Sequence, residues 1–301
     1  MDVSIIIVNY NTKDLLFNCL KSIYKHTYDV EFEIIVVDNA SVDGSQDCVK
    51  CSFPQVLLVE SKVNLGFGKA NNLGAKYSKG NFLFLLNSDT VLIENSVKIL
   101  FSFFVENGDK LNIGVLGTIL VDEKLDNNGF GNSFPTCSEE NKKNLRTIPI
   151  INFFVSAPIE KKYDFEKKYF EIDYVIGADM FLRKNLFDKM KGFSKEFFMY
   201  YEETDLQKRM HNIGFKQYIL TKTKIIHLEE GSGKVINNYS NRKRIITHKS
   251  RIIYLKRNDE QNYFKYALFF LFILFLNFFN FKYSLKENVS YFKEIVKILL
   301  K

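Results

Sequence analysis

The sequence predicts an α/β protein built on a largely parallel sheet. Before residue 90, short apolar runs alternate with segments of helical spacing, and one of these runs is apolar at every position. Alternating strands and helices are typical of consecutive βαβ units. The fully apolar run, residues 82–86, follows Gly80 and ends at Asn87. We expect it to be a strand that is buried on both faces, near the centre of the sheet.

Three further strands are expected before this one. Residues 3–8 and 33–37 are rich in Ile and Val, which favour strands, and residues 55–59 form a shorter run. Between the strands, helices are expected to begin near Asn11 or Thr12, near Ser45, and after Asn64. The composition, 46% hydrophobic and 26% charged, is that of a globular protein, and 301 residues allow one large domain with an extension.

Polar residues stand where three of these strands end. Asn9 follows the first strand, Asp38 ends the second, and Asn87-Ser88-Asp89 ends the fourth. Because the carboxyl ends of parallel strands meet at one edge of a sheet, we expect a ligand site there. The oxygen atoms of Asp89 and its neighbours suit Mg²⁺ or Mn²⁺ that carries a substrate diphosphate. Asn, Ser and Asp also favour turns and helix caps, so a strand exit without a ligand is the alternative.

Two other motifs are not expected to carry chemistry. Gly66 and Gly68 match part of a dinucleotide-binding loop, but Asn71 stands at the third glycine position, so a dehydrogenase is not expected. Cys48 and Cys51 have no second pair or neighbouring His that would complete a zinc site. We expect free thiols and a cytosolic protein, because the chain opens on a strand without a basic and apolar leader.

Three carboxylates, Glu202, Glu203 and Asp205, begin a helix that follows an aromatic run. The helix dipole accounts for about one acidic residue at such a position. Three together indicate a positive ion or a proton-donating substrate nearby, and therefore a candidate general base. A strand at residues 224–226 then leads to His227, which is either a ligand or a buried structural histidine.

The middle and the C-terminal part of the chain differ from this pattern. Residues 122–172 are irregular and polar, and we expect a variable insertion that either faces an acceptor or only connects elements. Basic residues gather between 222 and 265, and residues 266–281 are apolar and uncharged. A helix of that length reaches about 24 Å, short of the roughly 30 Å of a bilayer core, so a span is not expected.

We expect residues 258–301 to form a helical extension that lies on an anionic membrane surface. Its last part, residues 291–301, has the spacing of an amphipathic helix that would lie in the same plane. A helix buried against the protein, or a seam between two copies of the chain, is the alternative.

Six ordered motifs resemble those of the family 2 glycosyltransferases. The resemblance covers residues 3–257 apart from the insertion, and the chain looks most like bacterial rhamnosyltransferase-type enzymes of surface polysaccharide assembly. The motifs are Ser4–Asn11, Val36–Ser45, Asn64–Phe67, Asn87–Thr90, Ile176–Ala178 and Tyr200–Leu206, and they are followed by His227 with a Gly-Ser pair beyond it.

The resemblance implies a Rossmann-like GT-A fold over residues 1–257, a nucleotide-diphosphate sugar donor, Mg²⁺ or Mn²⁺, and inversion at the anomeric carbon. It also implies a glycan or polyprenyl-linked acceptor, which agrees with a peripheral position on the inner face of the cell membrane. The net charge of +7 suits such anionic partners without indicating nucleic acid. A non-catalytic nucleotide-sugar or lipid-binding protein on the same fold is the alternative.

The resemblance assigns the donor side of the site as follows. Tyr10 is expected to stack on the base, and Asp38 to accept a hydrogen bond from it. Asp89 keeps the metal role of the family's D-x-D motif, although Asn87 replaces the first Asp, and His227 is a second candidate ligand. The remaining residues expected to line the donor pocket are Asn11, Asn64, Gly66, Asn71, Asn87 and Ser88.

On the acceptor side, the resemblance places Glu203 at the position of the catalytic base, where many relatives carry Asp. Glu202 is the alternative base. Asp205 is expected to orient the acceptor or the helix. A nucleotidyltransferase is not expected, because the turn after the first strand lacks a glycine-rich basic loop.

Overall fold

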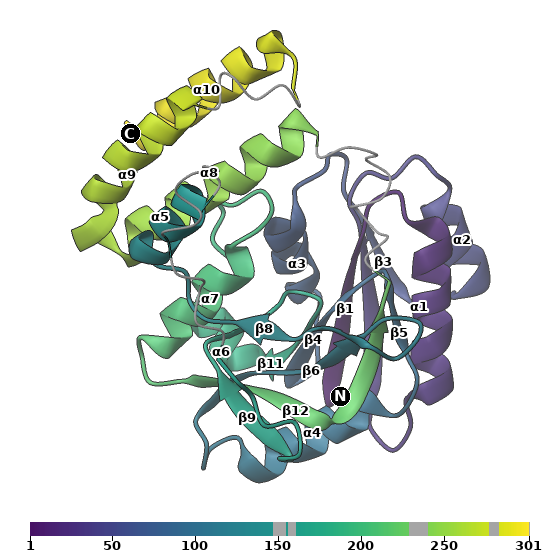
Figure 1. The fold of residues 1–301 in the computed structure, drawn as a ribbon. Coiled ribbons are helices and arrows are strands. Elements are labelled where there is room, and N and C mark those ends of the chain that lie inside the picture. Colours follow the sequence, from purple (N-terminus) through teal and green to yellow (C-terminus); the bar gives the residue numbers. More distant parts are fainter. Residues whose placement is uncertain (147–154, 156–160, 229–239, 277–282, 301) are drawn as a thin grey trace. The chain divides into compact units, whose positions relative to one another are not determined.

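The chain divides into two compact units in the computed structural model, which describes residues 1–146, 155, 161–228, 240–276 and 283–300 (Figure 1). We call them the sheet unit and the helical unit. The sheet unit comprises Met1–Ser133, Asp164–Phe198 and Glu202–Asn237. The helical unit comprises Phe134–Tyr163, Met199–Tyr201 and Asn238–Lys301.

One ten-stranded sheet forms the centre of the sheet unit. Its strands are β1 (Val3–Asn9), β2 (Phe32–Asp38), β3 (Leu57–Glu60), β4 (Phe82–Asn87), β5 (Thr90–Leu92), β6 (Ile113–Val121), β7 (Asn127–Gly129), β9 (Tyr169–Ile172), β11 (Asp179–Arg183) and β12 (Lys216–His227). Their order is β3-β2-β1-β4-β11-β6-β12-β5, with β7 beside β6 and β9 beside β12. β1 is parallel to β2 and β4, whereas β11 is antiparallel to β4 and β6.

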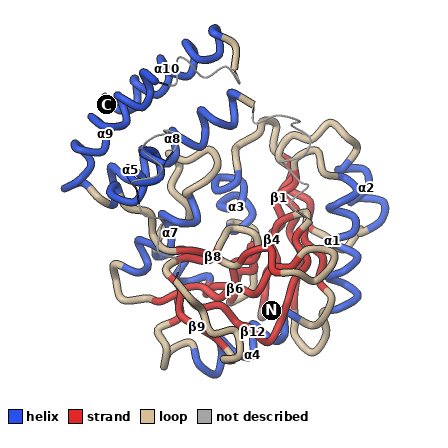
Figure 2. The backbone as a smooth tube through the Cα atoms, in the orientation of Figure 1, coloured by secondary structure: helices blue, strands red, loops and turns tan. Residues whose placement is uncertain are grey.

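Helices cover both faces of this sheet, which Figure 2 shows in red. They are α1 (Lys13–His26), α2 (Ser45–Ser52), α3 (Phe67–Ala75), α4 (Ser96–Asn107), α6 (Lys184–Lys189) and α7 (Glu202–His211). Leu16 of α1 joins the core cluster that contains Ile5 and Ile7 of β1. On the other face, α3 comes so close that a Cβ at Gly74 would lie 2.6 Å from Cγ2 of Ile6. Successive residues of β1 therefore pack against different helices.

The strands predicted before residue 90 are confirmed with small shifts. Residues 82–86 are at most 8% exposed, as expected for a strand with two buried faces. The third strand begins at Leu57, because the Val56 N–H donates to the Phe53 carbonyl at 2.9 Å in a turn. β6 was not anticipated, although all of its residues are buried. Gly114 and Gly117 interrupt its apolar run and weaken the strand pattern.

The insertion expected at residues 122–172 is partly regular, so its description as irregular was wrong for several segments. It contains β7, β9 and α5 (Cys137–Arg146), and β8 (Gly131–Asn132) pairs with β10 (Tyr174–Val175). β7 and β9 bond to β6 and β12 of the main sheet, and such non-local pairing leaves little local signal. Residues 147–154 and 156–160 lie outside the described residues.

The helices in the described part of the helical unit are α5, α8 (Asn241–Asn258), α9 (Glu260–Leu276) and α10 (Leu285–Leu299). Tyr254, Tyr266, Phe270 and Tyr291 are at most 1% exposed and form its core. The boundary expected after residue 257 falls at the end of α8, whereas the contacts group all of α8 with α9 and α10.

One face of α9 is buried and the other is apolar and exposed. Phe264, Leu268, Phe272 and Phe275 recur along it and are 55–71% exposed. Within the described residues, no helix combines the length and the apolarity that crossing a bilayer requires. Residues 277–281 of the apolar segment lie outside the described part. The amphipathic helix expected at the end of the chain is confirmed as α10, which begins earlier than expected, at Leu285.

Candidate active site

The carboxyl ends of β1, β2 and β4 meet at one edge of the sheet. In the parallel register of these strands, Asn9 pairs with Asp38 and Val8 pairs with Asn87. The polar residues that end the strands are therefore neighbours, as the sequence predicted. Open α/β sheets bind ligands at such an edge, where the loops that leave the strands form a crevice.

Asn9 organises the loops that leave β1 and β2. Its amide donates to Asp38 Oδ1 and Ser41 Oγ, both at 3.0 Å, and its Oδ1 accepts from Thr12 Oγ1 at 2.7 Å. Asp38 is 1% exposed, and its Oδ2 accepts from the Ser41 N–H at 2.9 Å and from Gln46 Nε2 at 2.7 Å. A carboxylate can accept about four hydrogen bonds. Asp38 therefore keeps acceptor capacity beyond the bonds that hold its own loop.

Tyr10 and Asn11 follow Asn9 directly. Tyr10 is 47% exposed, so its ring is accessible to a flat ligand. Asn11 has a φ of +54°, a left-handed conformation that Asn tolerates. The Asn11 N–H donates to Ser41 Oγ at 2.9 Å, and Asn11 Oδ1 accepts from the Val42 N–H at 2.8 Å. Asn11 thus ties the loop that presents Tyr10 to the loop after β2.

The turn before α3 has a steric reason for its glycine. Gly66 has a φ of +81°, and a Cβ there would lie 1.9 Å from the Phe198 carbonyl oxygen. The Phe67 N–H donates to the same oxygen at 3.1 Å. Asn64 Oδ1 accepts from the Gly66 N–H and from Asn39 Nδ2, both at 2.9 Å. Gly66 and Asn64 therefore shape the backbone that enters α3.

Asn71 and Asn39 are both buried beside this turn. Asn71 is 1% exposed and donates to the Phe67 carbonyl at 3.1 Å within α3, so it faces its own helix. Asn39 was not among the predicted site residues. It is 2% exposed, and its Oδ1 accepts from the Leu65 N–H at 2.8 Å. Its position directly after Asp38, at a predicted strand end, was the available signal.

Asp89 and His227 come together across two strands. In the antiparallel pairing of β5 with β12, Thr90 lies opposite His227. The Leu228 N–H donates to the Asp89 carbonyl at 2.9 Å. As a result, Asp89 Oδ1 lies 3.4 Å from His227 Nε2. Ser88, which precedes Asp89, places its hydroxyl oxygen 3.0 Å from that of Thr12.

This donor set fits a divalent cation that completes its shell with diphosphate oxygens and water. Asp89 supplies a hard oxygen and His227 a nitrogen, and Mg²⁺ and Mn²⁺ commonly keep several non-protein ligands. No group of three or more His, Cys, Asp or Glu side chains in the described residues is arranged to hold a metal alone. An ion here would therefore depend on the substrate for part of its coordination.

Residues 177–178 link this edge of the sheet to the start of α7. The Ala178 carbonyl accepts from the Asn87 N–H at 2.9 Å. One residue earlier, a Cβ at Gly177 would lie 3.3 Å from Phe67 Cε1 and 3.8 Å from Glu203 Cβ. The strand end that leads to Asp89 and the helix start that carries Glu203 thus both lie next to this two-residue segment.

Glu202 and Glu203 open α7 in different surroundings. Glu202 is 2% exposed, and its Oε2 has no hydrogen-bond partner in the described part of the chain. Glu203 is partly exposed. Burial raises the pKa of both carboxyls, and the charge of Glu203 raises the pKa of Glu202 further. A raised pKa makes a carboxylate a stronger base near neutral pH.

Asp205 and Gln207 hold α7 in place. Asp205 is fully buried and accepts from Arg209 Nε at 2.9 Å, while Arg209 also donates to the Met190 and Gly192 carbonyls. Gln207 exchanges two hydrogen bonds with the backbone of Val175, at 2.8 Å and 2.7 Å. This placement suits the expectation that Asp205 orients the helix.

Asp179 was not among the predicted site residues, although it is fully buried beside this edge. Its Oδ2 accepts from the Thr118 N–H at 2.6 Å and from Thr118 Oγ1 at 2.7 Å. Its Oδ1 has no hydrogen-bond partner among the described residues. Burial raises the pKa of Asp179 to about 7, although the Thr118 bonds and the charge of His227 oppose the rise. A charged residue opening an apolar strand was the signal that could have indicated it.

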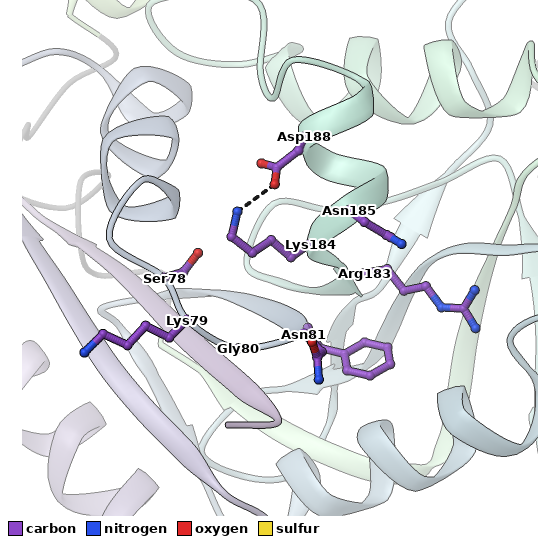
Figure 3. A pocket seen from close by; sticks show the side chains of 9 residues that line it. Ser78, Lys79, Gly80, Asn81, Arg183, Lys184, Asn185 and Asp188 are labelled. Atoms are coloured by element: carbon purple, nitrogen blue, oxygen red, sulfur yellow. Dashed lines mark hydrogen bonds and ion pairs between the residues drawn. The ribbon is translucent and has the colours of Figure 1, made fainter.

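The cavity in Figure 3 lies at the opposite edge of the sheet. It has a volume of about 430 Å³ and is lined by residues that include Gly80, Phe82 and Arg183. Lys184 on its wall forms an ion pair with Asp188 at 2.6 Å. Because β4 runs from Phe82 away to Asn87, this cavity is separate from the candidate active site.

The sheet unit has a fold of the GT-A type. Among solved structures, residues 1–349 of TarS from S. aureus, in complex with UDP-GlcNAc, match with a TM-score of 0.59 and 17% identity over 99% of this chain and 82% of that chain. The mannosyltransferase PcManGT from Pyrobaculum calidifontis, in complex with GDP-Man and Mn²⁺, matches with a TM-score of 0.56 and 13% identity over 98% and 75%. The chain belongs to glycosyl transferase family 2, whose model matches residues 4–190.

Curated relatives include hexosyltransferases. The poly(ribitol-phosphate) beta-glucosyltransferase of Bacillus spizizenii is 33% identical over 38% of this chain and 19% of its own length. The low-salt glycan biosynthesis hexosyltransferase Agl10 of Haloferax volcanii is 26% identical over 72% and 64%. The UDP-Glc:alpha-D-GlcNAc-diphosphoundecaprenol beta-1,3-glucosyltransferase WfgD of Escherichia coli is 29% identical over 35% and 42%. The chain thus spans less than two thirds of the length of these relatives.

Proposed function

We propose that the protein is an inverting glycosyltransferase that moves a sugar from a nucleotide-diphosphate donor to an acceptor hydroxyl. The observation that carries this proposal is the short segment 177–178, which contacts both the strand end before Asp89 and the start of α7 at Glu203. The strand end before the proposed donor-side carboxylate and the helix start with the proposed acceptor-side carboxylate thereby lie near the same segment of one unit. This proximity supports direct displacement, which requires a base and a leaving group on opposite sides of the reacting carbon.

In the proposed reaction, Glu203 accepts the proton of the acceptor hydroxyl. The hydroxyl oxygen then forms a bond to the anomeric carbon, and the bond from that carbon to the diphosphate oxygen breaks, which inverts the configuration. Asp89 and His227 would hold Mg²⁺ or Mn²⁺, which supplies charge neutralisation for the departing diphosphate. The raised pKa of Glu203 suits its role, because the deprotonated carboxylate is a stronger base than an exposed one.

Tyr10, Asp38, Asn64 and Gly66 are proposed to form the nucleotide side of the site. The exposed Tyr10 ring would stack on the base, and the remaining acceptor position of Asp38 would receive its N–H. Asn11, Asn39 and Asn71 support this pocket from within. The donor sugar is proposed to be a hexose, as in the relatives, or the 6-deoxyhexose rhamnose that the motifs suggested.

The acceptor is proposed to be a glycan carried by a polyprenyl lipid, in the synthesis of a cell-surface polysaccharide. WfgD is named for a diphosphoundecaprenol-linked acceptor. In this chain, the exposed apolar face of α9 accompanies the basic residues of α8 within the helical unit. These features support a cytoplasmic protein that lies peripherally on the inner face of the membrane.

Transfer assays with a panel of nucleotide sugars, including UDP-hexoses, GDP-mannose and a nucleotide-linked rhamnose, test this function. We expect one donor class to yield free nucleoside diphosphate and a product whose anomeric configuration, read by NMR, is opposite to that of the donor. Excess EDTA should stop the reaction. Donor binding by calorimetry without any turnover, across a range of lipid-linked acceptors, would instead support a non-catalytic binding protein.

A further inference from the structure

Helix α8 presents two buried arginines to the interior of the helical unit. Arg244 is 4% exposed and Arg251 is 9% exposed. They are seven residues apart, so they lie on the same face of the helix, about 10.5 Å apart along its axis. The helix contains no carboxylate, and its basic residues are Arg242, Lys243, Arg244, Lys249, Arg251, Lys256 and Arg257.

Within the described residues, Arg251 has one carboxylate partner, Glu140, and shares it with Lys143. Its Nη1 donates to Glu140 Oε2 at 2.7 Å. Glu140, 2% exposed, also accepts from Lys143 Nζ at 2.7 Å, so one negative charge faces two positive ones. The Nε and Nη2 atoms of Arg251 have no hydrogen-bond partner in the described residues. Its guanidinium also lies 5.1 Å from the centre of the Phe270 ring.

Arg244 has aromatic neighbours, and the exposed carboxylate of Glu287 interacts with it electrostatically. Its guanidinium carbon lies 3.4 Å from the centre of the Tyr291 ring and 4.5 Å from that of Tyr283. Its Nη1 donates to Asn288 Oδ1 at 3.1 Å. The described residues give it no ion pair, and its Nη2 has no hydrogen-bond partner among them.

The surroundings add positive field and further donors. Burial and the charges of Arg251 and Arg244 hold the pKa of His248 well below its usual range, so both arginines act on the same buried space. The Tyr266 hydroxyl is buried without a partner in the described chain. Buried charges and donors are unfavourable when nothing compensates them. Such groups in a native fold indicate an ion or ligand that completes them.

We propose that this face of α8 binds a phosphate-type oxyanion through Arg244 and Arg251. The planar guanidinium fork matches two oxygens of a phosphate and forms strong charge-assisted hydrogen bonds. Glu140 is the one buried carboxylate beside the two buried arginines, and Glu287 near Arg244 is exposed to solvent, so the buried groups keep a net positive charge that a monophosphate or diphosphate would neutralise. The oxyanion is the phosphate of a lipid, and its assignment to the lipid-linked acceptor, in place of a phospholipid headgroup, rests on the proposed function.

Calorimetry with inorganic diphosphate tests the site directly. The full chain carries Asp89→Ala and the buffer contains EDTA, so that a metal-dependent donor pocket contributes no binding. We expect saturable binding that weakens at least tenfold in Arg244→Gln and in Arg251→Lys, which keeps a charge opposite Glu140. Arg242→Gln, an exposed arginine of the same helix, is the matched control and should bind like the parent.

Hydrogen exchange of the otherwise unaltered Asp89→Ala chain provides a second measurement that needs no change in α8. Diphosphate should slow exchange in Asn241–Asn258. An unchanged exchange rate there, an absence of binding, or equal affinity in all the arginine variants would overturn the proposal. If the Asp89→Ala chain binds diphosphate but the unmutated enzyme shows no turnover, only the proposed function is contradicted, and the oxyanion site is not.

Vesicle flotation identifies the source of the oxyanion. Phosphatidylcholine vesicles that contain polyprenyl phosphate are compared with vesicles that contain phosphatidylglycerol at equal charge. If Arg244→Gln and Arg251→Lys reduce vesicle binding more for vesicles with polyprenyl phosphate than for vesicles with phosphatidylglycerol, the site is assigned to the acceptor lipid. An equal reduction of binding to both vesicle types assigns the site to anionic headgroups in general. Binding equal to that of Arg242→Gln for both vesicle types contradicts a lipid phosphate.

Discussion

Glu203 and Glu202 are adjacent carboxylates, but only Glu203 is partly exposed. Glu203→Gln keeps the shape of the side chain and removes its ability to accept a proton. We expect turnover to fall by about 10²–10⁴. Donor binding, measured by calorimetry, should survive because the base acts on the acceptor. Glu202→Gln should lose much less activity. A dead Glu202→Gln with an active Glu203→Gln would move the base by one residue.

Asp89 and His227 should contribute unequally to the bound ion. Asp89→Ala removes the charged ligand, and we expect turnover to be abolished at any Mn²⁺ concentration. His227→Ala should remain active but require more Mn²⁺, since the carboxylate and the diphosphate still bind the ion. Activity titrations with Mn²⁺, and the electron paramagnetic resonance signal of the bound ion, measure both effects. Full activity of the unmutated enzyme in excess EDTA would exclude a metal role.

Asp179 should make stability depend on pH in metal-free buffer. Its pKa is about 7 in the folded state against 3.8 ordinarily. The folded state therefore binds its proton more tightly, and this contribution to stability is present at low pH and is lost as pH rises toward 7. Asp179→Asn does not titrate. Urea unfolding should show the stability of the unmutated chain, relative to Asp179→Asn, falling by up to about 4 kcal/mol across that window.

At the level of elements, the turn into α3 depends on the absence of a side chain at Gly66. Gly66→Ala would place a Cβ 1.9 Å from the Phe198 carbonyl oxygen at a φ of +81°. Gly214→Ala is the matched control, with a φ of +93° and nothing within 4 Å of the new Cβ. We expect Gly66→Ala to be less stable than the control by about 1–3 kcal/mol in urea unfolding. Equal losses would show that the contact with Phe198 relaxes freely.

α9 and α10 also behave as structural elements of their unit. Tyr266, Phe270, Tyr291 and Ile295 are at most 1% exposed, and they pack with α8. Removing residues 266–301 would therefore expose the core of the helical unit. Point changes on the exposed face of α9 separate membrane binding from folding more cleanly than a truncation does.

For the whole molecule, the proposed membrane surface can be tested with the full chain. We expect cosedimentation with vesicles that contain phosphatidylglycerol, and weaker binding at high salt, because exposed cations contribute electrostatically. Phe264→Ser combined with Phe272→Ser should weaken binding at least about tenfold, since each ring contributes roughly 1.5–3 kcal/mol when buried.

Val105→Ser is the matched control for this experiment. Val105 is an apolar residue on α4 of the sheet unit, and its exposure of 61% lies between those of Phe272 and Phe264. The Val105→Ser substitution should leave vesicle binding unchanged. A full chain that never cosediments would remove the membrane role of α9 and favour a contact with another protein copy on that face.

Local pattern was sufficient for the elements that carry the site. Residues 82–86 are apolar at every position, and Glu202 begins a helix of regular spacing, so neighbours in the chain determine both. The polar ends of β1, β2 and β4 were predictable for the same reason. The motifs at these positions were also sufficient to indicate family 2. Side-chain preference and periodicity are properties of short segments, and a sequence displays them directly.

Only the tertiary structure decided which of these residues meet. The contact of Asp89 with His227 depends on the pairing of β5 with β12, and the unusual pKa of Asp179 depends on its burial beside Thr118. The two faces of α9 carry the same apolar residue types, so periodicity alone could not separate them. Their difference comes from packing against α5, α8 and α10. Contacts between distant segments and the loss of solvent set these properties, and neither is encoded in local spacing.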